Sequence, residues 1–267
     1  MKILIINGSA HRGNTWKLVE QAKNCLVESQ KEIEFDEVHL IEESLPFCIG
    51  CSNCFRVGYE KCPHYNVIGK IIEKIETADG IIIATTTYNM RETALLKNLF
   101  DHFCFMLHRP HFFKSKALVI TTTGGVGGHA AAKSVKGTLL GIGFNRCYTF
   151  SAASFSWNAY VPGNKTLVSL RKVVQKFYTD VKSKKLHNPK MGLLIPYNLF
   201  RGMSLAYVPG TDYETEDGVY WTDECRKGLV YAPGIEVAFY KKPIGHLFYW
   251  IGKLAGNMKG MQVTYKK

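Results

Sequence analysis

The chain has 267 residues, 46% of them hydrophobic and 21% charged, with a formal net charge of +12. This composition, without low-complexity tracts, excludes an intrinsically disordered protein. No apolar run of eighteen residues occurs, which argues against a transmembrane helix of ordinary length. The apolar run after Met1 is too short for a signal peptide and no cleavage site follows it. We therefore expect a cytoplasmic protein, with cysteines that are reduced or metal-bound rather than disulfide-bonded.

Positive charge is concentrated in the middle third of the chain. Residues 105–187 contain 13 Lys and Arg against 1 acidic residue, whereas residues 1–104 contain 11 against 14. Such a basic segment can attract an anionic cofactor, an acidic protein, nucleic acid or anionic lipid. No recognition-helix motif accompanies it, so we do not expect a nucleic-acid-binding protein.

Short β-branched runs alternate with longer amphipathic segments along residues 1–184. The short runs predict buried strands, and the amphipathic segments predict helices. Strands that alternate with helices form an open parallel sheet with right-handed crossovers, so we expect an α/β fold. The strands are expected at 2–7, 33–40, 81–84, 118–120 and 147–150, and the helices at 14–29, 67–75, 93–107, 129–140 and 165–184.

Residues 188–267 are expected to form a C-terminal extension of a domain at residues 1–187. Pro189 and Pro196 should break the helix that precedes them, and residues 231–239 look strand-like or extended. Residues 241–254 are an aromatic, apolar helix flanked by lysines. Three roles are open for this helix, in order of preference: a dimer arm, a cover over this chain's own sheet edge, and a helix at a membrane surface.

Ligands of open parallel sheets bind at the carboxyl ends of the strands, where strand order reverses. The loop at residues 8–15 offers two glycines, two hydroxyls and an asparagine at a helix start, which predicts an anion site. It approaches the pattern G-x-x-x-x-G-K-[ST], but Asn14 stands at the lysine position, and G-x-G-x-x-G is absent. The loop therefore predicts a site for one phosphate, such as that of FMN, with an ordinary capped turn as the alternative.

Two further loops follow the third and fourth expected strands. Residues 85–90 supply hydroxyls, an amide and the ring of Tyr88, against which a flat ligand ring can lie beside the backbone of Asn89 and Met90. Residues 121–128 contain four glycines, which let backbone amides approach a ligand closely. Three such loops at one sheet edge indicate a ligand site there.

Four cysteines form the run C-x2-C-x2-C-x7-C between Cys48 and Cys62. Two residues between cysteines let the sulfurs converge on one metal centre, and Gly50 permits the turn that this requires. Zinc sites usually have two separated C-x2-C pairs, so an iron–sulfur cluster is favoured, with zinc and free or redox-active thiols as alternatives. The remaining cysteines are each expected to lie alone and to be dispensable for iron: Cys25, Cys104, Cys147 and Cys225.

These motifs resemble those of the flavodoxin-like NAD(P)H-dependent FMN reductase superfamily, and within it the iron–sulfur flavoprotein branch. Residues 8–15 resemble its phosphate loop, residues 86–101 its segment beside the isoalloxazine, residues 123–125 its third loop, and the cysteine run its cluster motif. The resemblance, which covers roughly residues 1–185, implies a flavodoxin-like doubly wound sheet of five parallel strands. It also implies FMN, NAD(P)H as hydride donor and a [4Fe–4S] cluster. The residues implied to bind the flavin are Ser9, His11, Arg12, Gly13, Asn14, Thr15, Thr86, Thr87, Tyr88, Asn89, Met90, Thr123, Gly124 and Gly125, and those implied to bind the metal are Cys48, Cys51, Cys54 and Cys62.

The chain departs from the family pattern at three places. His11 stands where the family has the arginine of its phosphate loop, and Thr86 stands where it has a proline. After Cys62, residues 63–66 replace the paired aspartates of many relatives. The resemblance implies an oxidoreductase that passes electrons to an acceptor which the sequence does not name.

The alternative function is a non-enzymatic flavin and iron–sulfur electron carrier that docks an acidic redox partner through the basic segment. A homodimer or homotetramer is expected. Any membrane contact is expected through residues 241–254.

Overall fold

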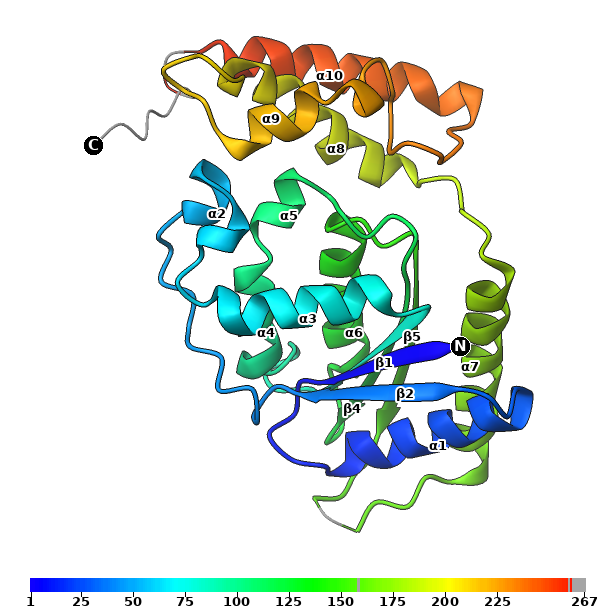
Figure 1. The fold of residues 1–267 in the computed structure, drawn as a ribbon. Helices are drawn as coiled ribbons and strands as arrows, with labels where there is room; N and C mark the ends of the chain where they lie inside the picture. The colour runs from blue at the N-terminus through cyan, green and yellow to red at the C-terminus, as the bar shows by residue number, and fades with distance from the viewer. Residues whose placement is uncertain (158, 259, 261–267) are drawn as a thin grey trace.

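The computed structural model describes residues 1–157, 159–258 and 260. It contains a five-stranded parallel sheet with the order β2-β1-β3-β4-β5 and helices on both faces (Figure 1). This arrangement confirms the expected flavodoxin-like α/β fold. The strands are β1 (Lys2–Asn7), β2 (Glu34–His39), β3 (Gly80–Thr86), β4 (Lys116–Thr123) and β5 (Arg146–Ala153).

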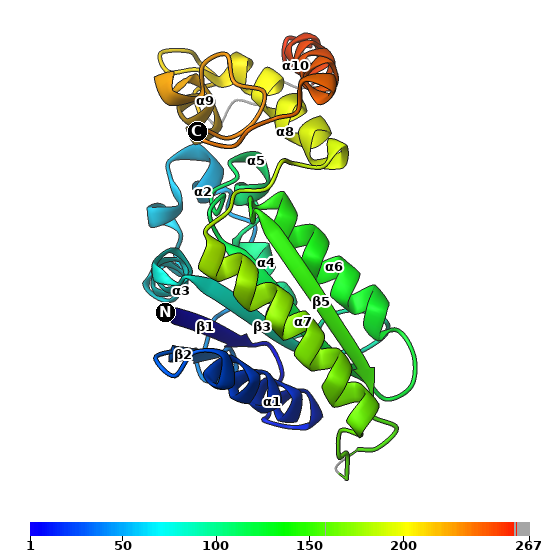
Figure 2. The same cartoon turned by 90° about the vertical axis from the view of Figure 1, so that its right-hand side faces the viewer.

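The two faces of the sheet are covered by different helices because alternate residues of a strand point to opposite faces. In β1, Leu4 and Ile6 pack with the helices of one face, α3 (Tyr65–Thr77), α4 (Ala94–His102) and α6 (Gly128–Gly141). Ile3 and Ile5 pack with the helices of the other face, α1 (Asn14–Ser29) and α7 (Asn164–Ser183). Figure 2 shows α6 and α7 on either side of β5. Burial on both faces explains the continuous apolar runs within the central strands β1, β3 and β4.

The strand order reverses between β1 and β3. The chain passes from β1 to β2 on one side and then crosses to β3 on the other. In doubly wound sheets a ligand binds at this point, outside the carboxyl ends of the strands. The loops that begin at Gly8 and Thr87 therefore become neighbours.

Residues 93–107 do not form the single helix that was expected. The helix α4 ends at His102, Phe103 leaves helical geometry with φ −91° and ψ 7°, and a short helix α5 (Phe105–His108) follows. This break turns Cys104 toward the cysteine run. Within that run lie a short helix α2 (Asn53–Arg56) and a 3₁₀ turn at Tyr59–Lys61.

The extension packs on its own small core and lies over α2 and α5 (Figures 1 and 2). It contains the helices α8 (Met191–Met203), α9 (Glu216–Thr222) and α10 (Lys242–Gly256). The expectation that Pro196 breaks a helix is wrong, because α7 has already ended at Ser183 and Pro196 lies inside α8. Backbone packing holds α8 in place: a Cβ on Gly202 would lie 2.2 Å from the Tyr249 carbonyl oxygen of α10. Three 3₁₀ turns complete the extension, at Ser204–Tyr207, Glu224–Arg226 and Phe239–Lys241.

Residues 231–239 form no strand and contribute Tyr231, Ile235 and Val237 to the extension's core. Among the described residues, no helix has the length and apolar character needed to cross a membrane.

Candidate functional site

The loop after β1 is held tightly against the end of β3. The Gly8 N–H donates to the carbonyl oxygen of Ala84 at 2.8 Å. A Cβ on Gly8 would lie 2.8 Å from the Cβ of Leu96 on α4, so only glycine lets the chain pass here. The start of the loop is thus fixed by backbone packing at the point where the strand order reverses.

Hydroxyl groups from three loops meet just beyond this point. Ser9 Oγ and Thr15 Oγ1 each lie 3.1 Å from Thr86 Oγ1, and Thr15 Oγ1 lies 2.6 Å from Thr122 Oγ1. Ser9 Oγ also accepts the backbone N–H of Thr86 at 3.1 Å. Residues far apart in the chain, at the ends of β1, β3 and β4, are therefore joined by one network of short polar side chains. Three of its members were named from the sequence: Ser9, Thr15 and Thr86.

The first turn of α1 has no side-chain cap from its N-cap residue. Its N-cap residue, Gly13, has no side chain to accept a hydrogen bond, and no acidic residue lies in the first turn. The N–H groups of a first helical turn then require another acceptor, and the helix dipole favours an anion. Asn14 does not point its amide into this opening, because its Nδ2 donates to the carbonyl oxygen of Ser156 at 2.8 Å. Asn14 instead ties the loop after β5 to the loop after β1.

The two basic residues of the loop at residues 8–15 have different environments. A guanidinium nitrogen of Arg12 lies 2.8 Å from His39 Nε2, and the guanidinium sits 5.4 Å from the centre of the Trp16 ring. Its charge is thereby held beside the loop. His11 is exposed, and its ring lies over Gly13, where a Cβ would come within 2.7 Å of its Nε2.

The loop after β3 contains two consecutive residues in left-handed geometry. Asn89 has φ 48° and Met90 has φ 64°, which non-glycine residues rarely adopt. Tyr88 and Arg91 hold the turn by exchanging backbone hydrogen bonds of 3.0 and 2.9 Å. Thr87 Oγ1 is buried at the base of this loop without a hydrogen-bond partner in the described part of the chain. A buried, unpaired hydroxyl in a native fold requires an explanation, and a ligand is one.

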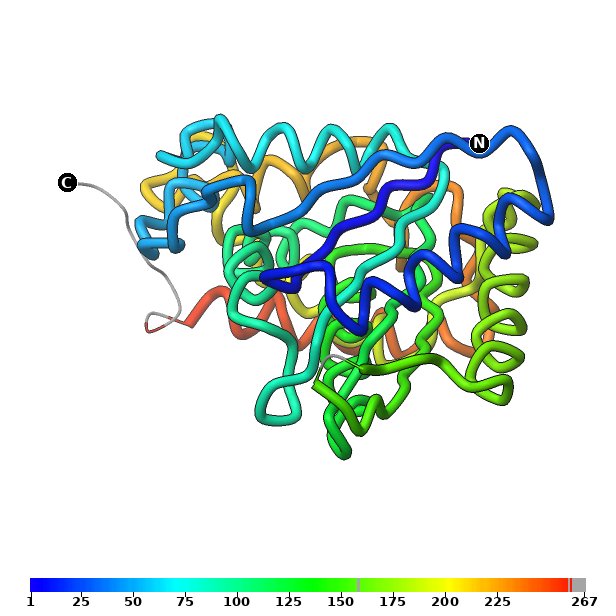
Figure 3. Tube along the Cα trace, turned by 90° about the horizontal axis from the view of Figure 1, so that it is seen from below, coloured from blue at the N-terminus to red at the C-terminus, as the bar shows by residue number. Residues whose placement is uncertain are grey.

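The loop after β4 lies against the loop after β3. Gly127 has φ +86°, and a Cβ there would lie 3.0 Å from the Cα of Met90. Gly124 has open space where its Cβ would be, and the Thr123 hydroxyl donates to the carbonyl oxygen of Val126. Figure 3 views these loops from below, with the loops after β3 and β4 reaching to the same side. All three predicted loops thus converge, and Gly124 leaves free space beside them.

The loop after β5 adds aromatic residues that sequence reasoning missed. Phe155 is 81% exposed with φ 44°, and Trp157 is fully exposed. The Asn14–Ser156 hydrogen bond holds this loop beside the loop after β1. The only signal in the sequence was an aromatic pair just after the fifth strand. Such exposed rings beside a polar opening are well placed to cover a flat ligand.

The four cysteines of the run line one cavity of ≈ 130 Å³. Cys48 and Cys51 are exposed, while Cys54 and Cys62 are partly buried. A fifth thiol, that of Cys104, lines the same cavity, so the expectation that this residue lies alone is wrong. The break between α4 and α5 brings it there. The remaining lining consists of Gly50, Ser52, Phe55, Tyr59, Ile68, Asp101, His102 and Phe105.

The thiols of the cavity differ in acidity. Contact with the Cys104 thiol, together with burial, raises the pKa of Cys54 far above its ordinary value. The same contact lowers the pKa of Cys104 to about 7. Burial raises the pKa of Cys62.

A family model described as NADPH-dependent FMN reductase matches residues 1–160. The chain belongs to this family. The match ends near the loop after β5 and covers all three loops of the hydroxyl network. The predicted membership of the FMN reductase superfamily is confirmed.

The curated relatives are iron–sulfur flavoproteins, which confirms the predicted branch of the family. One from Methanocaldococcus jannaschii is 39% identical over 102 residues, 38% of this chain and 51% of the relative. One from Archaeoglobus fulgidus is 36% identical over 103 residues, 38% of this chain and 48% of the relative. A third, from Clostridioides difficile, is 28% identical over 187 residues, 69% of this chain and 81% of the relative. The chain thus spans about half the length of the first two relatives.

Solved structures share the fold. An NADH:FMN oxidoreductase, EMOB, in its apo form has a TM-score of 0.51 and 21% identity, and the match covers 72% of this chain and 98% of that one. The flavoenzyme NAD(P)H:acceptor oxidoreductase FerB from Paracoccus denitrificans has a TM-score of 0.51 and 22% identity, covering 69% of this chain and 99% of that one. At these identities the likeness shows the common fold alone.

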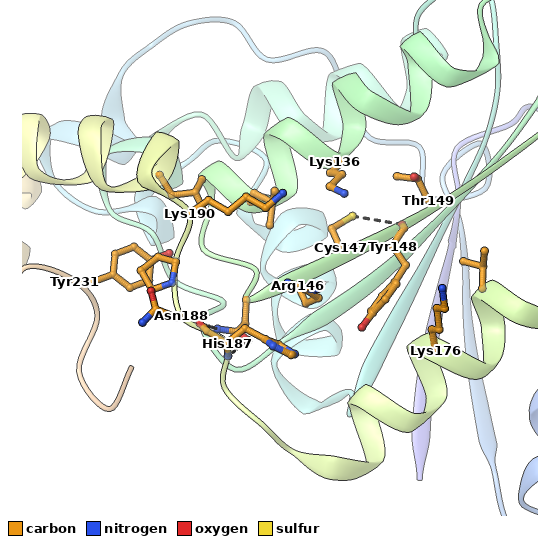
Figure 4. A pocket seen from close by; sticks show the side chains of 15 residues that line it. Lys136, Arg146, Cys147, Tyr148, Thr149, Lys176, His187, Asn188, Lys190 and Tyr231 are labelled. Atoms are coloured by element: carbon orange, nitrogen blue, oxygen red, sulfur yellow. Dashed lines mark hydrogen bonds between the residues drawn. The ribbon is translucent and has the colours of Figure 1, made fainter. Parts of the chain in front are cut away.

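A second cavity, of ≈ 420 Å³, lies along β5 between α6, α7 and the start of the extension (Figure 4). Its charged lining is almost wholly basic. The one nearby carboxylate, Asp180, accepts a hydrogen bond from Tyr148 at 3.0 Å and lies 2.7 Å from His187 Nε2. Three basic residues of the segment at residues 105–187, namely Lys136, Arg146 and Lys176, thus lie at one edge of the sheet. The basic residues that line this cavity are Lys136, Arg146, Lys176, His187 and Lys190.

Proposed function

We propose that this member of the FMN reductase family is an oxidoreductase that binds FMN and takes hydride from NADH or NADPH. It passes the electrons to an acceptor that is still to be identified. FMN supplies the redox chemistry, and the chain binds and orients it. We further propose that the four-cysteine run holds a [4Fe–4S] cluster.

The observation that carries the flavin proposal is the buried, unpaired hydroxyl of Thr87 where three loops meet. The uncapped first turn of α1 beside it suits a phosphate. Residues 8–15, 85–90 and 121–128 contain no acidic side chain that would repel one. Ser9 and Thr15 would lie at the phosphate, with Tyr88, Met90 and Gly124 bordering the ring.

The convergence of four thiols on one cavity supports the cluster proposal, because a [4Fe–4S] cluster is held by four cysteine thiolates. Residues outside the cysteine cavity also hold the cysteine run in place. Arg109, which is only 8% exposed, donates to the carbonyl oxygen of Cys54 and forms an ion pair of 2.5 Å with Asp217 of α9. The extension thus braces the backbone of the cysteine run.

Flavin identity and turnover test the first proposal. Flavin extracted from the purified protein is expected to run as FMN on chromatography. Steady-state oxidation of NADH or NADPH with an artificial acceptor is expected to depend on that flavin. Protein that binds FAD but not FMN would contradict the assignment of the phosphate loop.

Anaerobic iron analysis tests the second proposal. The wild type is expected to contain about four irons per chain, with a broad thiolate-to-iron absorption that dithionite bleaches. Cys51→Ala is expected to lose most of the iron and keep the flavin, because the flavin loops are built from other residues. Metal-free wild type with four alkylatable thiols in the run would reject the cluster.

A non-enzymatic electron carrier is the second candidate, favoured by the basic lining of the cavity along β5. Such a surface suits an acidic redox partner. A carrier would show no steady-state NAD(P)H oxidation. Its electron transfer to an acidic carrier protein would slow as ionic strength rises, since salt screens exposed charges.

A further inference from the structure

Two histidines lie beside the cysteine run and have no part in the four-cysteine set. Ligand atoms of Cys62, His64 and His102 all lie within 4.8 Å of one another. Cys62 ends the 3₁₀ turn of the run, His64 is the N-cap residue of α3, and His102 is the last residue of α4. The fold therefore gathers one sulfur and two imidazoles from three elements.

The ring of His102 is held in place by one of its two nitrogens. It is 5% exposed, and its Nε2 lies 3.0 Å from the carbonyl oxygen of Pro46. A carbonyl only accepts hydrogen bonds, so Nε2 carries the proton and Nδ1 presents a lone pair. Nδ1 has no hydrogen-bond partner in the described part of the chain. Metal-binding histidines are commonly fixed by such a bond from their other nitrogen to a backbone carbonyl.

His64 and Cys62 are also already close to the positions that an ion would require. The ring of His64 meets that of His102 edge-on, with centroids 5.2 Å apart, and no carboxylate of the described residues pairs with either. Pro63 restricts the preceding residue to extended backbone, and Cys62 has φ −64° and ψ 133°. Zinc bonds of about 2.0–2.3 Å place tetrahedral ligand atoms roughly 3.3–3.8 Å apart. Closure around an ion thus requires shifts of only about 1 Å.

We propose that, in the protein without a cluster, Cys62, His64 and His102 form a mononuclear site for a divalent ion of the zinc class. One thiolate and two imidazoles are a ligand set that such ions prefer. The fourth coordination position opens onto the cysteine cavity, which Cys62 and His102 both line. Because Cys62 also belongs to the four-cysteine run, this ion and a four-cysteine cluster exclude one another.

Cobalt binding to the cluster-free full chain tests the site. Anaerobic, reduced Cys51→Ser protein is titrated with Co²⁺ alone, and it is expected to develop the visible bands of tetrahedral cobalt, which Zn²⁺ abolishes. The substitution removes one thiol of the four-cysteine set and leaves all three proposed ligands. Adding His64→Gln or His102→Gln is expected to weaken Co²⁺ binding by more than about 100-fold. Loss of a residue that only hydrogen-bonds to a metal ligand weakens binding by up to about 100-fold, so a larger effect indicates a direct ligand.

His246→Gln is the matched control, since His246 is exposed on α10 and its change should leave the titration unaltered. His64 is only partly buried, so its variant remains informative if His102→Gln misfolds. Unchanged cobalt bands in His64→Gln would overturn the proposal. The proposal would also be overturned by cobalt bands that are present in the wild type and absent from Cys51→Ser, because the cysteine run would then hold the ion.

A competition between Zn²⁺ and iron incorporation tests the same site. This experiment alone depends on the proposed cluster. Zn²⁺ added before anaerobic reconstitution is expected to lower iron incorporation in the wild type and to have less effect in His64→Gln. His64→Gln without zinc is expected to take up full iron. Loss of iron in that variant would overturn the proposal, because the histidine would then serve the cluster itself.

Discussion

At the scale of single residues, the candidate flavin site is built mainly from short polar side chains. Ser9, Thr15, Thr86 and Thr122 satisfy one another, whereas Thr87 Oγ1 is left without a partner among the described residues. A satisfied hydroxyl contributes to folding, and an unpaired buried one costs about 1–3 kcal/mol until a ligand meets it. The two kinds of threonine should therefore respond differently to the loss of the hydroxyl.

Replacing Thr87 with valine removes its hydroxyl with little change of shape. We expect the flavin-free protein to keep or gain stability, because no protein hydrogen bond is lost, while FMN affinity falls by about tenfold. Urea unfolding and flavin fluorescence titration measure the two effects. Thr85→Val is the control, since Thr85 Oγ1 accepts the Thr93 N–H at 3.2 Å, and its loss should destabilise the flavin-free protein. A stable Thr87→Val with wild-type FMN affinity would remove Thr87 from the site.

Replacing Asn14 with aspartate places a negative charge beside the start of α1 and removes the hydrogen bond to the Ser156 carbonyl oxygen. The helix dipole tolerates this charge, but it repels a phosphate dianion, so we expect FMN affinity to fall ten- to hundredfold. Asn24→Asp adds the same charge at an exposed position of the same helix and should leave the affinity unchanged. Equal affinities in both variants would contradict a phosphate at this helix start.

At the scale of elements, ion pairs join β2 to β1 and α3. Asp36 on β2 lies 2.6 Å from the Lys74 ammonium nitrogen of α3 and 3.4 Å from that of Lys2 on β1. Burial opposes ionisation of this carboxyl, but hydrogen bonds and charge from Lys74 and Lys2 prevail and hold its pKa below the ordinary value. The edge of the sheet is therefore sensitive to acid.

The sign of this effect follows from linkage. A carboxyl with a lowered folded pKa stabilises the protein above the unfolded value of about 3.9, and this stability is lost as pH falls through the folded pKa. We expect Asp36→Asn to reduce the free energy of unfolding at pH 6 and to differ less from wild type at pH 3. Urea unfolding at pH 6 and at pH 3 measures the free energy of unfolding of each protein. Glu42→Gln, an exposed change just after β2, should be neutral at both. A constant deficit in Asp36→Asn at both pH values would refute the assignment.

At the scale of the whole molecule, the extension is attached to the cysteine run through Arg109. Its ion pair with Asp217 is largely buried, with 8% and 13% of the side chains exposed, and Asp217 also lies 2.8 Å from His108 Nδ1. Tyr220 and Trp221 add hydrogen bonds to the carbonyls of Pro110 and His108. The cysteine cavity and the extension should therefore loosen together.

Replacing Asp217 with alanine tests this coupling. Removing one partner leaves Arg109 as an uncompensated buried charge, which costs up to about 3–5 kcal/mol. We expect lower stability, faster hydrogen exchange in residues 54–57 and faster loss of iron from anaerobic protein. Glu224→Gln breaks an exposed pair with Lys227 and should change stability by less than about 1 kcal/mol. Normal exchange in residues 54–57 of Asp217→Ala would show that the extension does not brace the run.

The sequence predicted the features that depend on local patterns. Continuous apolar runs such as Ile81–Ala84 identified the strands, and the helical spacing of apolar residues identified the helices between them. The order of strand, loop and helix then placed residues 8–15 and 85–90 at one edge of the sheet. Prediction from the sequence failed at two helices. At Phe103, tertiary packing breaks a helix that periodicity alone would continue. Pro196 was expected to break a helix, but packing against α10 keeps it inside α8.

What the sequence by itself determined is therefore the fold class, the loops that could bind a flavin and the four thiols close in sequence. Only the tertiary structure decided that Cys104 and His102 join the cysteine run, that Phe155 and Trp157 lie beside the loop after β1, and that α9 braces Cys54. These partners lie tens of residues or more apart in the chain. A local pattern constrains only its own strand or helix, whereas long-range proximity depends on how the elements pack together.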